Sequence, residues 1–424
     1  MVSALVPIFF GLLLFGLPIF ASLALAVGLA LQFFGGVDPM VVPMRMFSGM
    51  NNFSLMSIPF FILAAELMRI GGLSDRLIDL AKALIGWLPG GLAAATVLAC
   101  LFFGSISGSS PATVIAIGTI MYPAMVKAGY NKYFAIGLIT TAGTLGPIVP
   151  PSIALIIYGS VTGTSVGKLF AAGLLPALLI GSLLIAYSCW YSVRNKYPRD
   201  TFPTMAQIGT AFKRSAWGLG LPVILLGGIY SGIFTPTESA AAACLYGWLV
   251  GAVVYRTISM RDTVEILRNT GLLSGTLLLI TAGASAFSWI LASTGAPTQL
   301  ATQVLSSTDS PILIMLLFNL IMLVAGCFLD SASAIIILSP LMQPIAAQVG
   351  VDAIHFGIIT LVNLSVGMLT PPVGLNLFVA MGIAKMTLYE VFRASLPMIV
   401  LMLVALLIVT YVPTISTLLP SMLF

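Results

Sequence analysis

The chain has 424 residues, of which 59% are hydrophobic and only 7% are charged, and its mean hydropathy is +1.13. A soluble domain carries roughly a quarter charged residues, so this composition excludes a soluble globular protein. Seventeen Lys and Arg against twelve Asp and Glu give a net charge of +5, without a basic run that would serve as a nucleic-acid footprint. We therefore expect an all-α, polytopic membrane protein in a lipid bilayer, with no nucleic-acid partner.

The few cysteines and the single histidine exclude further classes. Cys100, Cys189, Cys244 and Cys327 lie in or beside apolar segments, which argues against a disulfide scaffold. His355 alone cannot build a histidine zinc site or a Ser/His/Asp constellation. A phosphate-binding loop of the Walker type is also absent from the sequence. We expect a protein that is not an enzyme, does not use ATP directly and takes its energy from an ion gradient.

The first apolar stretch, residues 1–37, lacks the basic start and short apolar core of a cleaved signal, so we expect it to remain as a membrane segment. A span needs about 20 apolar residues, and further charge-free stretches supply them. About 10 to 14 membrane segments are expected on this basis, some of them incomplete spans. The further stretches are 83–126, 133–167, 215–237, 239–255, 269–308, 310–329, 331–351 and 394–424.

Amphipathic and basic pieces separate these stretches. Residues 72–88 and 259–273 have apolar side chains at helical spacing beside charged ones, so we expect two helices along the membrane interface. The segment 193–215 is the most polar part of the chain, and the positive-inside rule places it in the cytoplasm. Its basic residues are Arg194, Lys196, Arg199, Lys213 and Arg214, and a second basic connection carries Arg256, Arg261 and Arg268. Chance placement of surface charge is the alternative.

An internal repeat relates the two halves of the chain. Pro150-Pro151 recurs as Pro371-Pro372 at an offset of 221 (371 − 150 = 221), and the same offset relates Ser110 to Ser331, Gly146 to Gly367 and Pro176 to Pro397. The connector 127–132 carries two lysines, whereas its counterpart 348–353 carries only an aspartate. Opposite faces of the membrane would explain this asymmetry, so an inverted repeat is favoured over a parallel one.

The repeat predicts the domain organisation. The first repeat is 1–195, with scaffold and arm helices in 1–88 and a hairpin with a broken helix in 89–165. A polar cytoplasmic linker follows at 196–216. The second repeat is 217–424, with scaffold and arm in 217–308, a hairpin with a broken helix in 309–386 and a final span in 390–424.

Four segments place Gly, Pro, Ser or Thr in the middle of apolar sequence: 102–113, 140–152, 324–334 and 364–376. A proline inside a helix costs about 3 kcal/mol, and such breaks are tolerated in a membrane only where they line a protein cavity. The tandem prolines free carbonyl oxygens that suit a hard monovalent cation such as sodium. Helix N-termini beyond the breaks favour an anionic substrate group. Close packing of small residues is the alternative, but the shared offset favours a binding site.

Isolated ionisable residues invite separate interpretations. Asp330 is the only acid in 310–351, and its burial in a membrane costs at least about 2.5 to 3.5 kcal/mol. We expect it to bind a cation or polar substrate groups, with a structural hydrogen-bonding role as the alternative. Glu66 can pair with Arg69, and Glu238 is expected to cap the helix that starts after Pro236. A structural role is favoured for His355 over a proton relay.

The stretches 104–118, 142–159, 232–243 and 366–380 resemble the large membrane subunit of tripartite ATP-independent periplasmic (TRAP) transporters, the DctM-like family. The similarity covers essentially the whole chain. It implies the elevator-type fold of the ion transporter superfamily, in which scaffold arms hold a mobile transport domain. That domain would contain two re-entrant hairpins, with tips on 104–110 and 326–333, and two broken helices, with breaks at 144–151 and 367–372.

The resemblance also implies function: sodium-driven import of an acidic substrate through the bacterial inner membrane. The implied partners are a separate small membrane subunit of about four helices and a soluble periplasmic binding protein. At matching positions, the first sodium site would use Gly104, Ser107, Gly146, Val149 and Pro151. The second would use Gly326, Asp330, Gly367, Thr370 and Pro372. Predicted substrate contacts are Asp330, Ser107, Ser109, Ser331 and Ser333. At the offset of 221, Gly104 aligns with Ala325 and departs from the pattern.

Sialic acid is the expected substrate, ahead of C4-dicarboxylates and other organic acids, and two or more sodium ions are expected per cycle. A self-sufficient ion-coupled carboxylate carrier of the same superfamily is the main alternative, because it would need no soluble component. A channel would place polar rings on continuous pore helices, and a membrane enzyme would need a nucleophile with an activating base. Neither pattern is present in the sequence.

Overall fold

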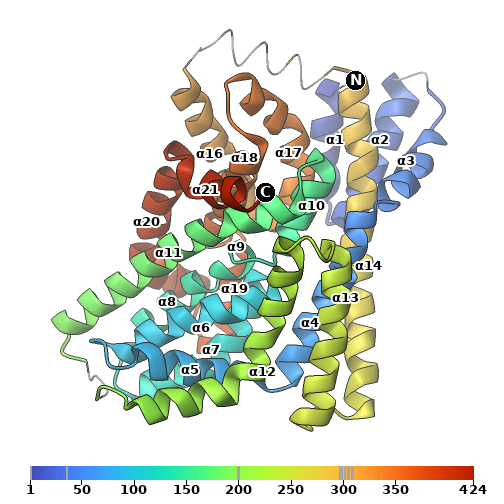
Figure 1. The fold of residues 1–424 in the computed structure, drawn as a ribbon. Coiled ribbons are helices and arrows are strands. Elements are labelled where there is room, and N and C mark those ends of the chain that lie inside the picture. The colour runs from blue at the N-terminus through green and yellow to red at the C-terminus, as the bar shows by residue number, and fades with distance from the viewer. Residues whose placement is uncertain are drawn as a thin grey trace.

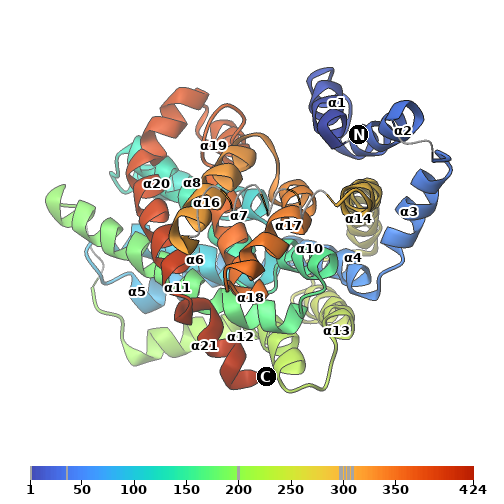
Figure 2. The same cartoon turned by 90° about the horizontal axis from the view of Figure 1, so that it is seen from above.

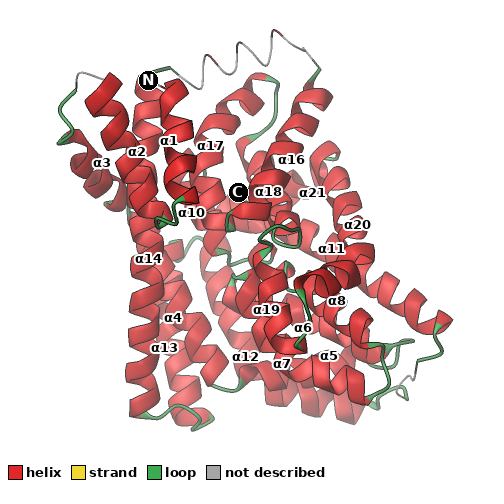
Figure 3. Ribbon diagram, turned by 180° about the vertical axis from the view of Figure 1, so that it is seen from behind, coloured by secondary structure: helices red, strands yellow, loops and turns green. Residues whose placement is uncertain are grey.

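The computed structural model describes residues 2–34, 37–197, 201–295 and 310–424, together with 299, 302 and 306. These parts are helical and contain no strand, as Figure 3 shows, so the all-α expectation is confirmed. Part of the predicted stretch 269–308 and the linker residue Arg199 lie outside the described residues.

A helical hairpin, a broken helix and a long helix occur in this order twice along the chain, as α6–α11 and as α16–α20. The first half contains α1 (Val2–Leu14), α2 (Ile19–Phe34), α3 (Val41–Met50), the 3₁₀ turn η1 (Phe53–Met56), α4 (Ser57–Ile70), α5 (Leu73–Ile85), α6 (Gly91–Ser107), α7 (Ser110–Lys127), α8 (Lys132–Ala142), α9 (Leu145–Ile148), α10 (Ile153–Thr162) and α11 (Val166–Arg194). The second half contains α12 (Met205–Tyr230), α13 (Pro236–Leu249), the π-helical turn η2 (Val250–Val254), α14 (Met260–Ser293), α16 (Pro311–Phe328), α17 (Ser331–Gln348), α18 (Ala353–Gly367), α19 (Leu375–Ala384), α20 (Leu388–Tyr411) and α21 (Thr414–Leu423).

Capping boxes fix where four of the second-half helices begin. At α13, the Thr235 hydroxyl accepts from the Glu238 backbone N–H at 3.3 Å, and the Glu238 carboxylate accepts from the Thr235 backbone N–H at 2.8 Å. These reciprocal bonds satisfy donors that a helix start otherwise leaves unpaired. The expected capping role of Glu238 is therefore confirmed. The same arrangement starts α12, α14 and α20.

Fewer helices are long enough to cross a membrane than the charge-free stretches indicated. Six described helices are both long and apolar enough, or eight if two bent pairs are counted as one span each. One of the six, α11, falls mostly outside the predicted stretches. The difference arises because residues 83–126 form two antiparallel helices, α6 and α7, and because 1–37 contains both α1 and α2.

One prediction about the polar pieces needs correction. Residues 259–273 are not a separate interfacial helix, because they form the first half of the continuous 34-residue helix α14. Residues 72–88 do contain a separate helix, α5, whose axis is bent by 76° from α4. Within the predicted linker 196–216, helix α12 already begins at Met205.

The helices fall into two groups that meet at α14. The frame helices are α1–α4, α13 and α14, with α14 packed against α2, α3 and α4, and α13 packed against α4. The carrier helices are α6–α10 and α16–α19. Figure 1 shows α14 running the height of the molecule, and Figure 2 shows it standing between α1–α3 on one side and α10 and α17 on the other. The contacts of α14 with α17, of α4 with α6 and of α4 with α10 join the two groups.

Candidate functional site

Each half of the carrier group consists of a helical hairpin and a broken helix. Hairpin 1 is α6 and α7, and break 1 is residues 149–152 between α9 and α10. Hairpin 2 is α16 and α17, and break 2 is residues 368–374 between α18 and α19. The tandem prolines lie inside the breaks, as their helix-breaking chemistry requires, and both Pro-Pro peptide bonds are cis.

Glycines allow each hairpin to approach its broken helix backbone to backbone. A Cβ atom built on Gly104 would lie 3.0 Å from the Cα atom of Gly146. A Cβ atom built on Gly326 would likewise lie 3.0 Å from the Cα atom of Gly367. The two close approaches are equivalent, so Gly104 corresponds in space to Gly326, at an offset of 222 (326 − 104 = 222). At the offset of 221, Gly104 aligns with Ala325 because the first helices of the two hairpins, α6 and α16, differ in register by one residue.

The carbonyl oxygens at the breaks carry the chemistry that a cation requires. Among the described residues, no hydrogen-bond donor reaches the carbonyl oxygens of 149–151 in break 1 or of 370–372 in break 2. Val149, Pro150 and Pro151 are buried, whereas Thr370 and Pro371 are partly exposed and Pro372 is exposed. An unpaired buried carbonyl oxygen costs free energy unless another partner, such as a hard cation, satisfies it. The buried carbonyl oxygens of break 1 fit such a cation, whereas those of break 2 are open enough for water to satisfy them.

At the first predicted sodium site, the tip of hairpin 1 lies against break 1. The Ser107 hydroxyl pairs with the Thr113 hydroxyl at 2.9 Å and donates to the Ser109 carbonyl at 3.3 Å. A Cβ atom on Gly108 would come within 2.9 Å of the Pro151 carbonyl oxygen. Tip and break are thus adjacent, as the sequence predicted.

At the second predicted site, Asp330 binds the helix that follows it. Its carboxylate accepts from the backbone N–H of Ala332 at 3.0 Å and of Ser333 at 3.2 Å, and also from the Ser333 hydroxyl. These are the bonds of an N-cap. The structure records no hydrogen bond between Asp330 and Gly326, Gly367, Thr370 or Pro372 among the described residues. Thr370 donates its hydroxyl proton to the Val366 carbonyl at 3.3 Å.

Both hairpin tips line one cavity of about 340 Å³, which we call the hairpin cavity. Of the predicted substrate contacts, Asp330, Ser109 and Ser331 line it. Ser107 and Ser333 do not, and their hydroxyls are bonded to Thr113 and Asp330. The full lining is Gly108, Ser109, Ser110, Pro111, Pro147, Ile153, Ala154, Leu273, Thr276, Leu277, Asp330, Ser331, Ala332, Met368 and Leu375.

Four helix N-termini converge on the hairpin cavity. The first residues of α7, α10, α17 and α19 are all in its lining. A helix N-terminus carries unpaired N–H groups and about half a positive charge, which favours an anion. At α17 the Asp330 carboxylate already occupies this position. The backbone N–H groups of Ser110, Ala112, Ile153 and Ala154, at α7 and α10, have no acceptor among the described residues.

Asp330 is the single ionisable side chain in the lining of the hairpin cavity, and no Lys or Arg is present there. An anion bound among these helix N-termini would therefore share an apolar space with a carboxylate. In a low-dielectric surrounding, that arrangement is unfavourable unless a cation or a proton is present as well. The cavity is consequently suited to an anion only in combination with a cation.

Sequence reasoning missed two contributors to this site. The Asn376 side chain donates to the Ser110 hydroxyl at 2.6 Å and so ties α19 of the second half to the start of α7 in the first. The α14 residues Leu273, Thr276 and Leu277 close the cavity from the frame side. Asn376 stands within the segment 364–376 that the sequence singled out, but nothing in the sequence around 273–277 marked α14 as a wall.

Glu66 and His355 have local partners. Arg69 pairs with Glu66 at 2.6 Å, as expected. His355 is buried and its ring nitrogens contact the Ser416 hydroxyl and, at 3.2 Å, the Thr410 carbonyl. These bonds tie α18 to the end of the chain, which agrees with a structural role.

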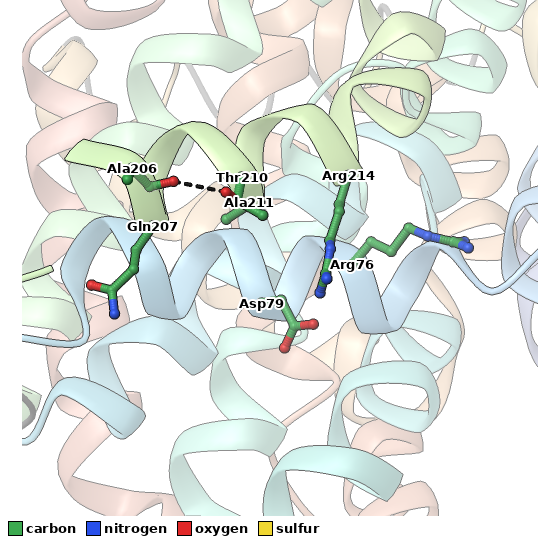
Figure 4. Close-up of a pocket in the computed structure, with 7 residues that line it drawn as sticks. All are labelled: Arg76, Asp79, Ala206, Gln207, Thr210, Ala211 and Arg214. Carbon is green, nitrogen blue, oxygen red and sulfur yellow. Dashed lines mark hydrogen bonds between the residues drawn. The ribbon is translucent and has the colours of Figure 1, made fainter. Parts of the chain in front are cut away.

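A separate groove lies between α5 and α12, which belong to neither the frame nor the carrier helices, where the predicted amphipathic helix meets the predicted basic segment. Figure 4 shows Arg76 and Asp79 on α5 and Gln207, Thr210 and Arg214 on α12 around this space of about 360 Å³. The groove contains no hairpin or break residue. It is therefore a feature of the arms and not part of the candidate site.

Comparison with known proteins places these features in context. The family described as "Tripartite ATP-independent periplasmic transporter, DctM component" matches residues 6–415. The C4-dicarboxylate TRAP transporter large permease protein DctM of Rhodobacter capsulatus is 41% identical over 98% of this chain and 99% of its own length. The isethionate TRAP transporter permease protein DctMQ of Oleidesulfovibrio alaskensis is 42% identical over 96% of this chain but 65% of its own length.

The sialic acid TRAP transporter large permease protein SiaM of Vibrio cholerae is 35% identical over 97% of this chain and 96% of its own length. Among solved structures, the YdaH transporter of Alcanivorax borkumensis, described as having an unusual topology, matches with a TM-score of 0.63 over 92% of this chain and 89% of that one. At 15% sequence identity, that likeness concerns the fold alone.

Proposed function

Because this chain belongs to the family of DctM components of tripartite ATP-independent periplasmic transporters, we propose that it carries a C4-dicarboxylate into the cytoplasm. The resemblance read from the sequence is confirmed, and with it the broader function of a transport subunit for organic acids. The driving ion, the substrate, the partners and the motion belong to the proposal and are argued separately below.

The observation that carries the proposal is the charge pattern of the hairpin cavity. Helix N-termini of both halves face it, with unpaired N–H groups at α7 and α10, while Asp330 is its one ionisable side chain. The N–H groups bind the substrate carboxylates, and the carboxylate of Asp330 requires a compensating cation nearby. Substrate and cation therefore bind favourably together and poorly alone, which is the thermodynamic basis of symport.

Sodium is the proposed cation because the donor sets at the breaks are oxygen atoms of carbonyls and hydroxyls. Gly104, Ser107, Gly146, Val149 and Pro151 would hold one ion, and Gly326, Asp330, Gly367, Thr370 and Pro372 another. The unpaired carbonyl oxygens of 149–151 and 370–372 support this assignment. Oxygen ligands without clustered carboxylates favour a monovalent hard ion over calcium or a transition metal.

A small dicarboxylate is proposed ahead of sialic acid. The relatives named for C4-dicarboxylates are 41 to 42% identical to this chain, whereas the relative named for sialic acid is 35% identical. The comparisons thus do not favour the sialic acid expectation. The isethionate relative, at 42% identity, indicates that other small organic anions belong to the same range.

We include two separate partners in the proposal: a small membrane subunit and a periplasmic binding protein that delivers the substrate at the bacterial inner membrane. The family description supports a tripartite, periplasmic system. The longer isethionate relative extends well beyond the region that this chain matches. In the proposed cycle, the carrier helices move as one body along α14 and take the hairpin cavity from one side of the membrane to the other.

Uptake of labelled succinate into proteoliposomes tests this function. The vesicles should contain the chain and its small subunit, with an inward sodium gradient and with or without the binding protein. Uptake that requires both sodium and the binding protein supports the proposal. Sodium-driven uptake without the binding protein would favour the self-sufficient carrier, and uptake of N-acetylneuraminate but not succinate would restore sialic acid as the substrate.

The same assay tests the second sodium site through Thr370. Replacing its hydroxyl by a methyl group, Thr370→Val, should raise the sodium concentration for half-maximal uptake, while Thr370→Ser should leave it close to that of the native protein. An unchanged sodium dependence in Thr370→Val would remove this residue from the site.

A further inference from the structure

A second cavity lies beside the hairpin cavity along the same helix. It has a volume of about 500 Å³ and is lined by residues of α3, α10, α14 and α17. The α14 residues of the hairpin cavity are Leu273, Thr276 and Leu277, and those of the second cavity continue with Thr281, Ala284, Ser288 and Ala292. This spacing of three and four residues keeps both cavities on one helix face, about one turn apart.

The second cavity differs from the hairpin cavity in the sign of its charge. Arg45 is the single ionisable side chain in its lining. Arg45 is exposed, has no ion pair among the described residues and has its guanidinium carbon 4.9 Å from the centre of the Trp289 ring. We call this space the Arg45 cavity. Its positive charge is held in place by an aromatic face and is available to an anion.

Uncommitted polar groups surround Arg45. Ser48 and Asn51 lie on the α3 side, and Ser285 and Ser288 lie on α14. None of these four side chains has a hydrogen-bond partner among the described residues. A guanidinium group with neighbouring hydroxyl and amide groups is the chemistry that binds a carboxylate by charge-assisted hydrogen bonds.

The position of the Arg45 cavity gives it a role in transport. Arg256, Arg261 and Arg268 mark the N-terminal part of α14, whereas the Arg45 cavity lies towards its C-terminal end. By the positive-inside rule, the arginine-rich end faces the cytoplasm, so the Arg45 cavity faces the side from which substrate arrives. It also lies between the frame and the carrier helices, where Asn52 donates to the Ser160 hydroxyl at 3.0 Å.

We propose that the Arg45 cavity is a first binding site for the carboxylate substrate, occupied before the substrate reaches the helix N-termini of the hairpin cavity. This inference rests on the proposed function for its substrate. The site binds a small organic anion through Arg45 and the serines of α14, and it needs no sodium because it contains no acid. The substrate then moves about one helical turn along α14 into the hairpin cavity.

Trp289 provides a direct readout, because a carboxylate that engages Arg45 changes the surroundings of the indole. We would replace Trp87, Trp190, Trp217 and Trp248 by Phe and titrate the purified chain in nanodiscs with succinate, with neutral succinamide as the control. A saturable change in Trp289 fluorescence with succinate but not succinamide is expected, with or without sodium. A charge-assisted contact predicts that Arg45→Gln raises the half-saturating concentration about tenfold or more, and Arg45→Lys by less.

A matched pair on α14 tests the charge requirement without touching Arg45. Ala292→Asp adds a carboxylate to the cavity lining, and Ala292→Asn adds a neutral group of nearly the same shape. Only Ala292→Asp should weaken the fluorescence response and raise the succinate concentration for half-maximal uptake. Equal behaviour of the two variants, or an unaltered titration in Arg45→Gln, overturns the proposal.

Two further measurements separate this inference from the proposed function. Asp330→Ala should lose uptake but keep the Trp289 response, since Asp330 is not in this cavity; loss of both would show that the cavities are one site. If the native chain fails to take up succinate, the proposed substrate is wrong. Titration with isethionate and N-acetylneuraminate then tests the Arg45 cavity alone, and the absence of a response to all three anions overturns it.

Discussion

Asp330 shows how one carboxylate can serve two needs. It caps α17 through the backbone N–H groups of Ala332 and Ser333, and it is the one charge in the lining of the hairpin cavity. The first half of the chain offers a natural comparison, because Ser109 stands at the same place before α7 and carries no charge. Capping alone could be performed by a serine in both halves. In line with the proposed function, we expect the acid to take part in cation binding as well as capping α17.

Substitution of Asp330 separates these two roles. Asp330→Ser keeps a capping hydroxyl and removes the charge, whereas Asp330→Ala removes both and costs about 1 kcal/mol of cap energy. We expect both variants to insert in the membrane and to lose sodium-driven uptake, with thermal stability lower in Asp330→Ala than in Asp330→Ser. Uptake and thermal unfolding measured on the same preparations check this. Near-normal uptake by Asp330→Ser would reduce the residue to a cap.

At the scale of elements, each hairpin and its broken helix form one unit held by glycine contacts. A Cβ atom at Gly367 would lie 2.5 Å from the Cα atom of Gly326, which is backbone and cannot move aside. By contrast, a Cβ atom at Gly382 in α19 would meet nothing within 4 Å. The two glycines are both in helices, but only Gly367 is required by packing.

We therefore predict opposite results for two Gly-to-Ala variants. Gly367→Ala should separate hairpin 2 from its broken helix, destabilise the protein by about 1 to 3 kcal/mol and strongly impair uptake. Gly382→Ala, the matched control, should be neutral or slightly stabilising, because alanine favours a helix over glycine. Thermal unfolding in detergent and initial uptake rates distinguish them. If Gly367→Ala is as stable and active as Gly382→Ala, the close approach is not essential.

Sequence alone was sufficient for elements whose cause is local. The proline breaks and the capping role of Glu238 follow from residue chemistry within a few positions, whereas the hairpin tips near Ser109 and Asp330 were expected from the family resemblance. The offset of 221 also related the two halves correctly at the breaks. The charge-free stretches did not show where one helix ends and the next begins, because such a stretch does not reveal whether the chain reverses direction inside it, as it does between α6 and α7.

Contacts between distant segments escaped sequence reasoning for a physical reason. The cavity wall formed by Leu273, Thr276 and Leu277 has no motif, because a smooth apolar helix face is sufficient to close a cavity. The Asn376 bond to Ser110 joins residues from the two halves, and neither residue alone reveals its partner. The register shift of Gly104 likewise becomes visible only when Gly146 is placed beside it.

At the scale of the whole molecule, the proposed motion requires the carrier helices to slide against the frame. The hydrogen bond from Asn52 to Ser160 crosses that boundary, since Asn52 follows α3 and Ser160 is on α10. The Trp248 to Thr263 bond, at 3.3 Å, connects α13 to α14 within the frame. The first contact offers a pair that crosses the boundary, and the second offers a control pair within the frame whose backbones are held farther apart by the long indole side chain.

A disulfide across the boundary should stop transport. In a background with Cys100, Cys189, Cys244 and Cys327 replaced, oxidised Asn52→Cys with Ser160→Cys should abolish uptake, and reduction should restore it, because side chains this close can form the bond. Trp248→Cys with Thr263→Cys, joined by a longer bifunctional thiol reagent, should remain active. Full uptake after complete cross-linking of the first pair, verified by mass spectrometry, would contradict a sliding motion between these groups.

The charged side chains in the lining of the hairpin cavity determine whether substrate can cross the membrane without sodium. A lysine or arginine among its lining residues would neutralise the substrate on its own, so the loaded carrier could cross without sodium and dissipate the gradient of the substrate. With Asp330 as the only ionisable side chain there, the anion alone is repelled, and the free energy of occupying the cavity falls only when cations accompany it. On the proposed function, strict coupling of substrate to sodium depends on the absence of Lys and Arg from this lining as much as on the presence of Asp330.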